Sequence, residues 1–420
     1  MWRFRLPCIV VPALAVVLAG CKTVAPRAAD SASPQSSGQA EWGIPVSRPA
    51  TPAPDVRAAA AYTLSSPVPG GLTEAGTYRL VKPYEAQCRA TANCPLAAAL
   101  CAENGIAGGK RHKEKSSQRS EDVLRQARAY RAGEERNKAA GRALELFYLL
   151  AEAEAGRDFL RQSKDKTEAM LGEVKELQGQ GIRVEKGPAQ IRRQRLDLLD
   201  REAELQLSLV QLHSNLRLLL GCPAEDQMPI WPDVDWKVVP APIDPGAAVS
   251  LGLYYRPDLN LLRMLIQCLD ADTLDAARSG LGSVSSLLGA SPIAACWLSH
   301  HLKDEVDSRR SQLCELLAGK ERAATEEIRQ AVAAIDVRLR QIAVAKQKVD
   351  QWQEQLQVQR MERQRPRSMV TALDIAATEL QCLDARRELI HQVLALRIAE
   401  AKLKEAQGLL DEECNPPCGN

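Results

Sequence analysis

The chain has 420 residues, of which 45% are hydrophobic, 26% charged and only 4% aromatic. With 55 Lys and Arg against 53 Asp and Glu, the formal net charge of +2 gives no indication of binding to nucleic acid or to an anionic membrane surface. Few aromatic residues and many Ala, Leu, Arg, Glu and Gln argue against an all-β domain and against an ordinary α/β enzyme, so we expect an all-α fold.

Residues 1–21 have the features of a lipoprotein signal peptide. Arg3 and Arg5 supply a positive start, and the apolar stretch that follows is too short to stay in a bilayer as a spanning helix. The sequence Leu-Ala-Gly-Cys ending at Cys21 resembles a bacterial lipobox, in which Cys21 is acylated, for example with palmitate, and becomes the mature N-terminus. The alternative is an ordinary signal peptide with a chance Cys. Residue 22 is Lys and not Asp, which by the sorting rule of enteric bacteria indicates the outer membrane.

Residues 22–75 are rich in Ala, Pro, Ser and Gly and are predicted to be a disordered tether. Of the 12 Cys, one lies in the signal and one in the lipobox. Cys414 and Cys418 are candidates for a disulfide that would close the C-terminal loop, but the sequence leaves the pairing of the Cys open. We expect most of the Cys to act as small apolar residues on helix faces. No His lies at ligand spacing near the Cys clusters, so we expect no metal and no cofactor.

Residues 76–221 are predicted to form a first helical repeat. Over 139–178 the chain has no Pro, and its apolar residues recur with helical periodicity. A Gly-Gln-Gly turn ending at Gly181 stops this helix, and a second helix is predicted over 189–220, before Gly221. Because only a short turn joins the two helices, we expect them to pack as an antiparallel hairpin.

Residues 222–246, which contain Trp and Pro, are predicted to be a connector. A second helical repeat follows over 247–410, and a tail over 411–420. Within this repeat, residues 246–279 have a helical pattern with a break at the sequence Arg-Pro-Asp-Leu over 256–259, where Pro would begin a new helix.

The clearest coiled-coil pattern lies between residues 311 and 363, where apolar residues recur with steps of four and three. This seam consists of Ile328, Val332, Ile335, Leu339, Ile342, Val349 and Leu356. Lys346 is predicted to occupy one seam position, where it either sets the register or lines a solvated wall. A break over 363–368 precedes the last long helix, 369–407, which ends at Gly408.

The two repeats share one layout of long helix, tight turn, long helix and terminal Gly. Gly181 and Gly221 are 221 − 181 = 40 residues apart, and Arg365 and Gly408 are 408 − 365 = 43 apart. The chain is therefore predicted to contain an internal duplication, with two tandem long antiparallel coiled-coil hairpins and little or no β-structure.

The lipobox, the tether, the two hairpins and the Arg-Pro-Asp-Leu sequence together resemble the TolC-like outer-membrane efflux protein family, over roughly residues 85–410. The sharper elements are Gly221, residues 256–259 and the phrase over 368–374. The resemblance implies a lipid-anchored trimer with a helical tunnel below a twelve-stranded barrel. It also implies a periplasmic adaptor at the tunnel tip and an inner-membrane pump that drives export of drugs, metals or proteins.

Two departures from the family pattern concern the hairpin turn and the barrel. The family's turn usually contains Gly where this chain has Arg365 and Pro366. The segments in the place of the barrel strands are 103–121, which is polar and basic, and 280–302, which lacks sustained alternation. We therefore expect the membrane barrel to be missing or vestigial, so that the lipid is the only membrane attachment. The basic run 110–115 either touches anionic headgroups or is a loop.

Both hairpin ends are basic, which indicates either a docking surface for a partner or solvated helix ends with acidic neighbours. The candidate docking residues are Gly181, Arg183, Lys186, Arg363, Arg365, Arg367, Ser368 and Thr371. The family-motif residues expected to have structural roles are Gly221, Arg256, Pro257, Asp258, Leu259 and Gly408.

No catalytic motif is present in the sequence: it has no phosphate-binding Gly-rich loop, no Gly-x-Ser-x-Gly and no His-Glu-x-x-His. We expect no enzyme. The leading hypothesis is an envelope lipoprotein that acts as the tunnel or adaptor-facing component of an efflux assembly and forms a homo-oligomer, a trimer if it is TolC-like. The alternative is a periplasmic coiled-coil scaffold or adaptor without channel activity.

Overall fold

The computed structural model describes residues 62–63, 78–107, 115–181, 188–284, 302–366 and 369–414, all within one compact unit, Ser47–Asn420. The predicted signal peptide, Cys21 and nearly all of the tether lie outside these residues, as do Arg183, Lys186, Arg367 and Ser368. Residues 108–114 and 285–301 lie outside as well, whereas 103–107 and 115–121 are helical. The expectation about the segments 103–121 and 280–302 stays a prediction.

The described residues are overwhelmingly helical, which confirms the predicted all-α class. The helices are α1 Pro83–Ala92, α2 Pro95–Ala107, α3 Lys115–Gly179, α4 Pro188–Leu219, α5 Pro245–Tyr255, α6 Pro257–Cys268, α7 Leu274–Val284, α9 Leu302–Arg363, α10 Ala372–Gln407 and α11 Leu409–Cys414. The helix predicted over 139–178 is longer than expected, because the polar residues from 115 onward are helical too.

Short strands of two or three residues pair the predicted connector with two residues of the predicted tether and with the start of the first repeat. These are β1 Tyr62–Thr63, β2 Arg79–Val81, β3 Ile230–Pro232 and β4 Lys237–Val238. In one pair β1 lies antiparallel to β4, and in the other β2 lies parallel to β3, with Leu80 opposite Trp231.

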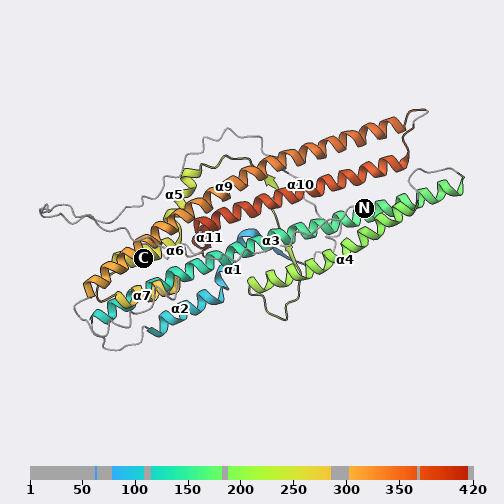
Figure 1. Ribbon diagram of the computed structural model, residues 1–420. Helices are drawn as coiled ribbons and strands as arrows, with labels where there is room; N and C mark the ends of the chain where they lie inside the picture. The colour runs from blue at the N-terminus through green and yellow to red at the C-terminus, as the bar shows by residue number, and fades with distance from the viewer. Residues whose placement is uncertain are drawn as a thin grey trace, which may run out of the picture. The chain divides into compact units, whose positions relative to one another are not determined.

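The four long helices lie side by side in the order α4, α3, α10, α9 (Figure 1). α3 and α4 form one hairpin, α9 and α10 form the other, and α3 packs on α10 between them. The ion pair between Glu145 and Lys402 (3.1 Å) and the contact of Lys166 with Glu379 show that α3 and α10 are antiparallel. Both hairpin turns therefore lie at the same end of the four-helix row, as Figure 1 shows.

Pro and Gly set the helix ends as the sequence predicts. Pro188 and Pro257 stand at the first position of α4 and α6, where a missing N–H costs nothing. Gly221 (φ 65°) follows α4, and Gly408 (φ 75°) follows α10, both in the left-handed conformation that ends many helices. The N–H of Gly408 donates to Glu405 O, so a carbonyl of the last turn is satisfied.

The core lies between the helices of the row. Phe147, Leu150 and Leu394 are fully buried where α3 meets α10, and Ile328 and Ile342 are fully buried where α9 meets α10. At the end away from the hairpin turns, α6 and α7 cover the first half of α3 and the start of α9.

The prediction that Lys346 occupies the α9 seam is wrong. Lys346 is exposed, and its neighbour Ala345 is buried between Ile342 and Val349. The steps of three and four keep the seam apolar, and a Lys in this place would have to lose the hydration of its charge.

The C-terminal disulfide also differs from the prediction, because Cys414 pairs with Cys88 and not with Cys418. After Gly408 the chain turns, and α11 packs on α1 and α3. The Gln87 side chain donates to Leu410 O (2.9 Å), which holds α11 against α1 and brings the two Cys to a Cα separation of 5.1 Å. Six other described Cys are free.

Candidate functional site

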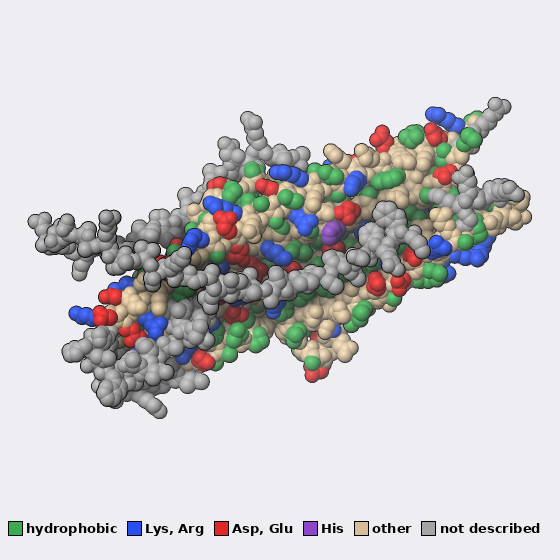
Figure 2. Space-filling model, in the orientation of Figure 1, with side chains coloured by type: hydrophobic (Ala, Val, Ile, Leu, Met, Phe, Trp, Pro, Cys, Tyr) green, Lys and Arg blue, Asp and Glu red, His purple; other side chains and the backbone are tan. Residues whose placement is uncertain are grey.

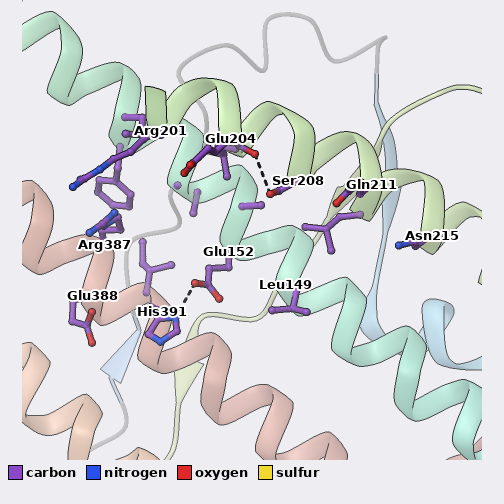
Figure 3. A pocket seen from close by; sticks show the side chains of 18 residues that line it. Leu149, Glu152, Arg201, Glu204, Ser208, Gln211, Asn215, Arg387, Glu388 and His391 are labelled. Atoms are coloured by element: carbon purple, nitrogen blue, oxygen red, sulfur yellow. Dashed lines mark hydrogen bonds and ion pairs between the residues drawn. The ribbon is translucent and has the colours of Figure 1, made fainter. Parts of the chain in front are cut away.

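An open groove of about 760 Å³ lies along α3, between α4 and α10 (Figure 3). Its floor is apolar, with Leu149 and Phe159 from α3, and its sides carry polar groups such as Arg201 and Glu204 from α4 and His391 from α10. Small residues of α3, such as Ala153 and Gly156, line the groove, so this face of the row is hollowed along α3.

The strongest polar contact in the groove joins α3 to α10. Nδ1 of His391 lies 2.8 Å from Oε1 of Glu152, and this hydrogen bond raises the pKa of His391 against the opposing effect of burial. Glu388 lies one turn away on α10, where it accepts from the side chain of Gln392 (2.7 Å). A second groove, of about 440 Å³, lies between α9 and α10 and runs past Glu388 to Lys348, and Val337 and Val344 of α9 also line it.

The chemistry of this surface is that of a wettable wall with charges of both signs. Figure 2 shows Lys, Arg, Asp and Glu side chains interspersed along the face of the helix row. Within the described ranges, no group of three or more His, Cys, Asp or Glu is placed to hold a metal ion.

The two hairpin ends differ in how their predicted residues are used. Gly181 has φ 78°, and its N–H donates to Gln178 O (3.0 Å). Arg363 and Arg365 are exposed at the end of α9. Thr371 is the N-cap of α10: its hydroxyl oxygen accepts from the N–H of Asp374, whose carboxylate accepts from the N–H of Thr371 (3.0 Å).

Part of the basic character near the turns is neutralised by acidic neighbours. Glu379 contacts Lys166, and it accepts from Arg360 at 2.6 Å, which joins α3, α9 and α10. Burial acts to raise the pKa of Glu379, but the hydrogen bonds from the two cations outweigh it, and the pKa is lowered. Arg195 pairs with Glu168 (3.2 Å). Other Lys and Arg side chains gather near the same end of α4 (Figure 2).

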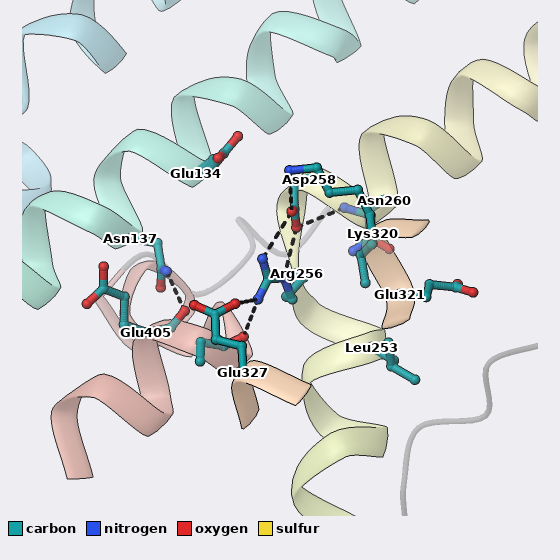
Figure 4. Close-up of polar contacts among 12 residues, drawn as sticks. Glu134, Asn137, Leu253, Arg256, Asp258, Asn260, Lys320, Glu321, Glu327 and Glu405 are labelled. Atoms are coloured by element: carbon teal, nitrogen blue, oxygen red, sulfur yellow. Dashed lines mark hydrogen bonds and ion pairs between the residues drawn. The ribbon is translucent and has the colours of Figure 1, made fainter. Parts of the chain in front are cut away.

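The Arg-Pro-Asp-Leu residues form a structural junction (Figure 4). Arg256 makes a bidentate pair with Asp258 (3.0 and 3.1 Å), and its Nη1 donates to Glu327 of α9 (2.6 Å) and to the carbonyl of Ala406 (3.0 Å). Burial acts to raise the pKa of Asp258, but Arg256 outweighs it and lowers the pKa. Leu259 is fully buried beneath this junction.

The structure brings Gly408 to the same junction and places Gly221 elsewhere. A Cβ on Gly408 would lie 3.0 Å from Cα of Arg256 and 3.1 Å from Cδ of Pro257. Gly221 instead lies against the side chain of Asn93, just before α2. Each glycine thus ends a long helix beside a break between two shorter ones.

Sequence reasoning missed the apolar side chains on the two outer helices of the row. On α4, Leu196, Leu207, Val210 and Leu218 are exposed, and on α9, Val337, Val344, Val358 and Met361 are exposed. Val344 follows Val337 by seven residues, and Val358 follows Val344 by fourteen. These multiples of seven place the three valines on one face of α9. The sequence did contain a sign of this exposed face, because α4 has a second set of Leu residues that do not lie on its buried face.

The structure was searched for a helix that could span a membrane. In the part of the chain that the structure describes, no helix combines the length and the apolar character needed to cross a bilayer.

The chain was compared with family models, with curated protein sequences and with solved structures, and only the solved structures gave matches. No family model and no curated protein sequence matches the chain. The Campylobacter jejuni CmeC outer membrane channel aligns with a TM-score of 0.55 and 12% identity over 78% of this chain and 84% of that one. A membrane protein from Pseudomonas aeruginosa gives 0.54 and 16%, over 70% and 72%. The outer membrane protein VceC from Vibrio cholerae gives 0.51 and 13%, over 78% and 95%. The predicted resemblance to the TolC-like proteins is thus confirmed in the fold, and this chain has the fold of bacterial outer-membrane channels.

Proposed function

We propose that copies of this chain associate side by side and form the wall of a tunnel in the cell envelope, through which an efflux assembly exports its substrate. The observation that carries the proposal is the pair of exposed apolar faces on α4 and α9, the two helices at the outer edges of the row. Contiguous exposed apolar surface usually marks an interaction site.

A second copy of the chain is the occupant that fits both edges. If α9 of one copy packs on α4 of the next, the contact is head to tail, and the same contact repeats until a ring closes. Three copies, the number implied by the resemblance, would supply twelve long helices. At about 10 Å between neighbouring axes the ring would measure about 38 Å across, which leaves a lumen of about 28 Å.

This hollowed, charged face would line the lumen. Arg201, Glu204, Arg387 and Glu388 would keep the wall wet and place charges of both signs on it. The chain would carry out no chemical step, and energy would come from an inner-membrane pump. The hairpin ends, with Arg363 and Arg365 exposed, would meet a periplasmic adaptor.

The proposed location is the outer membrane, with the body in the periplasm and a lipid on Cys21 as anchor. The disulfide between Cys88 and Cys414 supports export, because such bonds form and persist in oxidising compartments and are rare in the bacterial cytosol.

The test is the mass of the mature, lipidated chain in detergent, measured by light scattering. The parent is expected to be a trimer, and Val337→Glu on α9 is expected to shift it toward monomer. The control is Val239→Glu, because Val239 is as exposed (50%) as Val337 (49%) but follows β4 in the connector and is not on α4 or α9. A parent that stays monomeric at micromolar concentration would refute the tunnel and favour the scaffold. Equal effects of the two substitutions would refute the edge contact.

A further inference from the structure

The groove along α3, between α4 and α10, combines an apolar floor with two cationic side chains. Its apolar surface comes from all three helices, with Phe159 and Leu160 from α3, Leu205 and Leu212 from α4, and Ile390 from α10. Its volume of about 760 Å³ lies in the range of pockets that hold small organic molecules. The groove therefore has the size and the surface to take a molecule with an apolar body, such as a fused aromatic ring system.

Two guanidinium groups reach this groove from opposite walls. Arg201 belongs to α4 and Arg387 to α10, and Figure 3 shows both at the same end of the groove. Among the described residues, no carboxylate forms an ion pair with Arg201. Arg387 reaches Asp384 of its own helix at 3.9 Å, close to the upper limit for an ion pair. Two like charges at one end of a groove repel each other, and an anion bound between them removes this repulsion.

Three glutamates also line the groove, namely Glu152, Glu204 and Glu388. Glu152 already pairs with a histidine of α10, and Glu388 accepts a hydrogen bond from a glutamine of the same helix. Because acidic and basic side chains nearly balance, the groove as a whole has little net charge, and an anion is favoured where the two Arg side chains meet. A second negative charge on the same molecule would face Glu204, one turn after Arg201 on α4. The arrangement therefore favours a monoanion.

Beyond Glu204, α4 presents neutral polar side chains to the groove. Ser208, Gln211 and Asn215 follow one another along the helix (Figure 3). Their hydroxyl and amide groups can both donate and accept hydrogen bonds. The groove thus changes along its length from a cationic end to a neutral polar end.

We propose that this groove is a binding site for organic monoanions with an aromatic or other apolar body and one carboxylate or sulfonate group. The anionic group lies between Arg201 and Arg387, and the body lies on the floor beside Phe159. Guanidinium groups suit this ligand because they hold anionic oxygens with two parallel hydrogen bonds and also stack on aromatic rings. The site rests on the proposed function for the export of its ligand, and it names the class of substrate that the tunnel wall would recognise. Binding itself requires a single copy of the chain.

A matched pair of probes separates the charge from the apolar body. Naphthalene-1-sulfonate has the expected chemistry, and naphthalene-1-sulfonamide has nearly the same shape without the charge. Binding of each probe to the mature, lipidated chain in detergent is measured by isothermal titration calorimetry, with titrations into detergent alone subtracted. The parent is expected to bind the sulfonate. Arg201→Gln and Arg387→Gln are each expected to weaken sulfonate binding about threefold to fivefold and to leave sulfonamide binding unchanged.

Arg386→Gln is the matched control for the two charge variants. Arg386 precedes Arg387 on α10 and is exposed as well, but it does not line the groove. This variant is expected to leave the binding of both probes unchanged. An equal loss of sulfonate binding with Arg386→Gln would show that only the total charge of the chain matters, and it would overturn the site. A folded parent that does not bind the sulfonate at millimolar concentration would overturn it too.

Two further variants test the position of the ligand. Glu204→Gln removes a like charge beside the anionic group, so it is expected to strengthen sulfonate binding about twofold. Gly156→Leu places a side chain in the groove, where a Cβ would lie 3.8 Å from Cδ2 of Leu205, and it is expected to weaken the binding of both probes about fivefold. Gly172→Leu is its control, because Gly172 also belongs to α3 but does not line the groove. Leu favours a helix more than Gly does, so both leucine variants are expected to fold, which circular dichroism checks. Unchanged binding to folded Gly156→Leu would overturn the site.

Light scattering on the same samples keeps this site and the tunnel apart. A trimer that does not bind the sulfonate overturns the site and leaves the tunnel in place. A monomer that binds the sulfonate, with the expected losses at Arg201 and Arg387, overturns the tunnel and supports the site.

Discussion

Replacing Gly408 by Ala is expected to destabilise the chain through two separate effects. Gly408 has φ 75°, and an L-residue in the left-handed conformation costs about 1–2 kcal/mol. In addition, the new Cβ would lie 3.0 Å from Cα of Arg256, which is backbone and cannot rotate away. Arg256 would have to shift, and its hydrogen bonds to Ala406 and Glu327 would weaken. Adding one weakened buried hydrogen bond of about 1–2 kcal/mol gives a total of about 3 kcal/mol.

Gly181 provides a control that isolates the first effect. Its φ of 78° matches that of Gly408, but no described atom lies within 4 Å of its Cβ position. Gly181→Ala should therefore cost only the conformational term, about 1 kcal/mol. Both losses can be measured as free energies of unfolding from denaturant curves followed by circular dichroism at 222 nm. Equal losses for the two variants would refute the claim that the junction at Arg256 constrains Gly408.

Three further predictions concern the disulfide, the Arg256 junction and the groove. Cys88→Ser should lower the free energy of unfolding by up to about 5 kcal/mol, because the bond closes a loop with a sequence separation of 326, and a reducing agent should then shift the midpoint of the parent alone. Arg256→Lys keeps the charge but loses the bidentate pair with Asp258, so the melting temperature should fall by an amount that corresponds to about 2 kcal/mol; an unchanged melting temperature would contradict this role. The pKa of His391 is raised above 6.5 by Glu152, so its contribution to stability is complete below pH 6.5 and is lost as the pH rises through the raised value. Because the ring is 44% exposed, this contribution should be under about 1 kcal/mol, and NMR titration of the ring together with the pH dependence of His391→Gln would check both its sign and its size.

The positions of the helices follow from local chemistry and could be predicted. The helix expected over 189–220 is α4, Pro188–Leu219, because Pro at the first position and a left-handed Gly after the last one need only neighbouring residues. The break before Pro257 was predictable for the same reason. The first long helix was predicted too short, since a run of polar residues carries no apolar periodicity and yet continues α3.

The candidate site could be predicted only where its residues act locally. Thr371 and Asp374 form a capping box that a single helix start explains. The groove could not be predicted, because Glu152 and His391 are 391 − 152 = 239 residues apart and meet only when the two hairpins pack. The exposed face of α4 was missed for a related reason. Leu207 differs from a core leucine in that no helix of the described residues covers it.

The sequence alone therefore determined the all-α class, the two hairpins and the resemblance in fold, since helical periodicity, Pro and Gly act over a few residues. Tertiary structure decided which contacts the helices make. It paired Cys88 with Cys414, excluded Lys346 from the seam and gathered Arg256, Glu327 and Gly408 at one junction. These outcomes depend on which helix faces lie together, and every long helix of this chain carries more than one face that could be buried. Only the packing of the complete row selects which of them is covered.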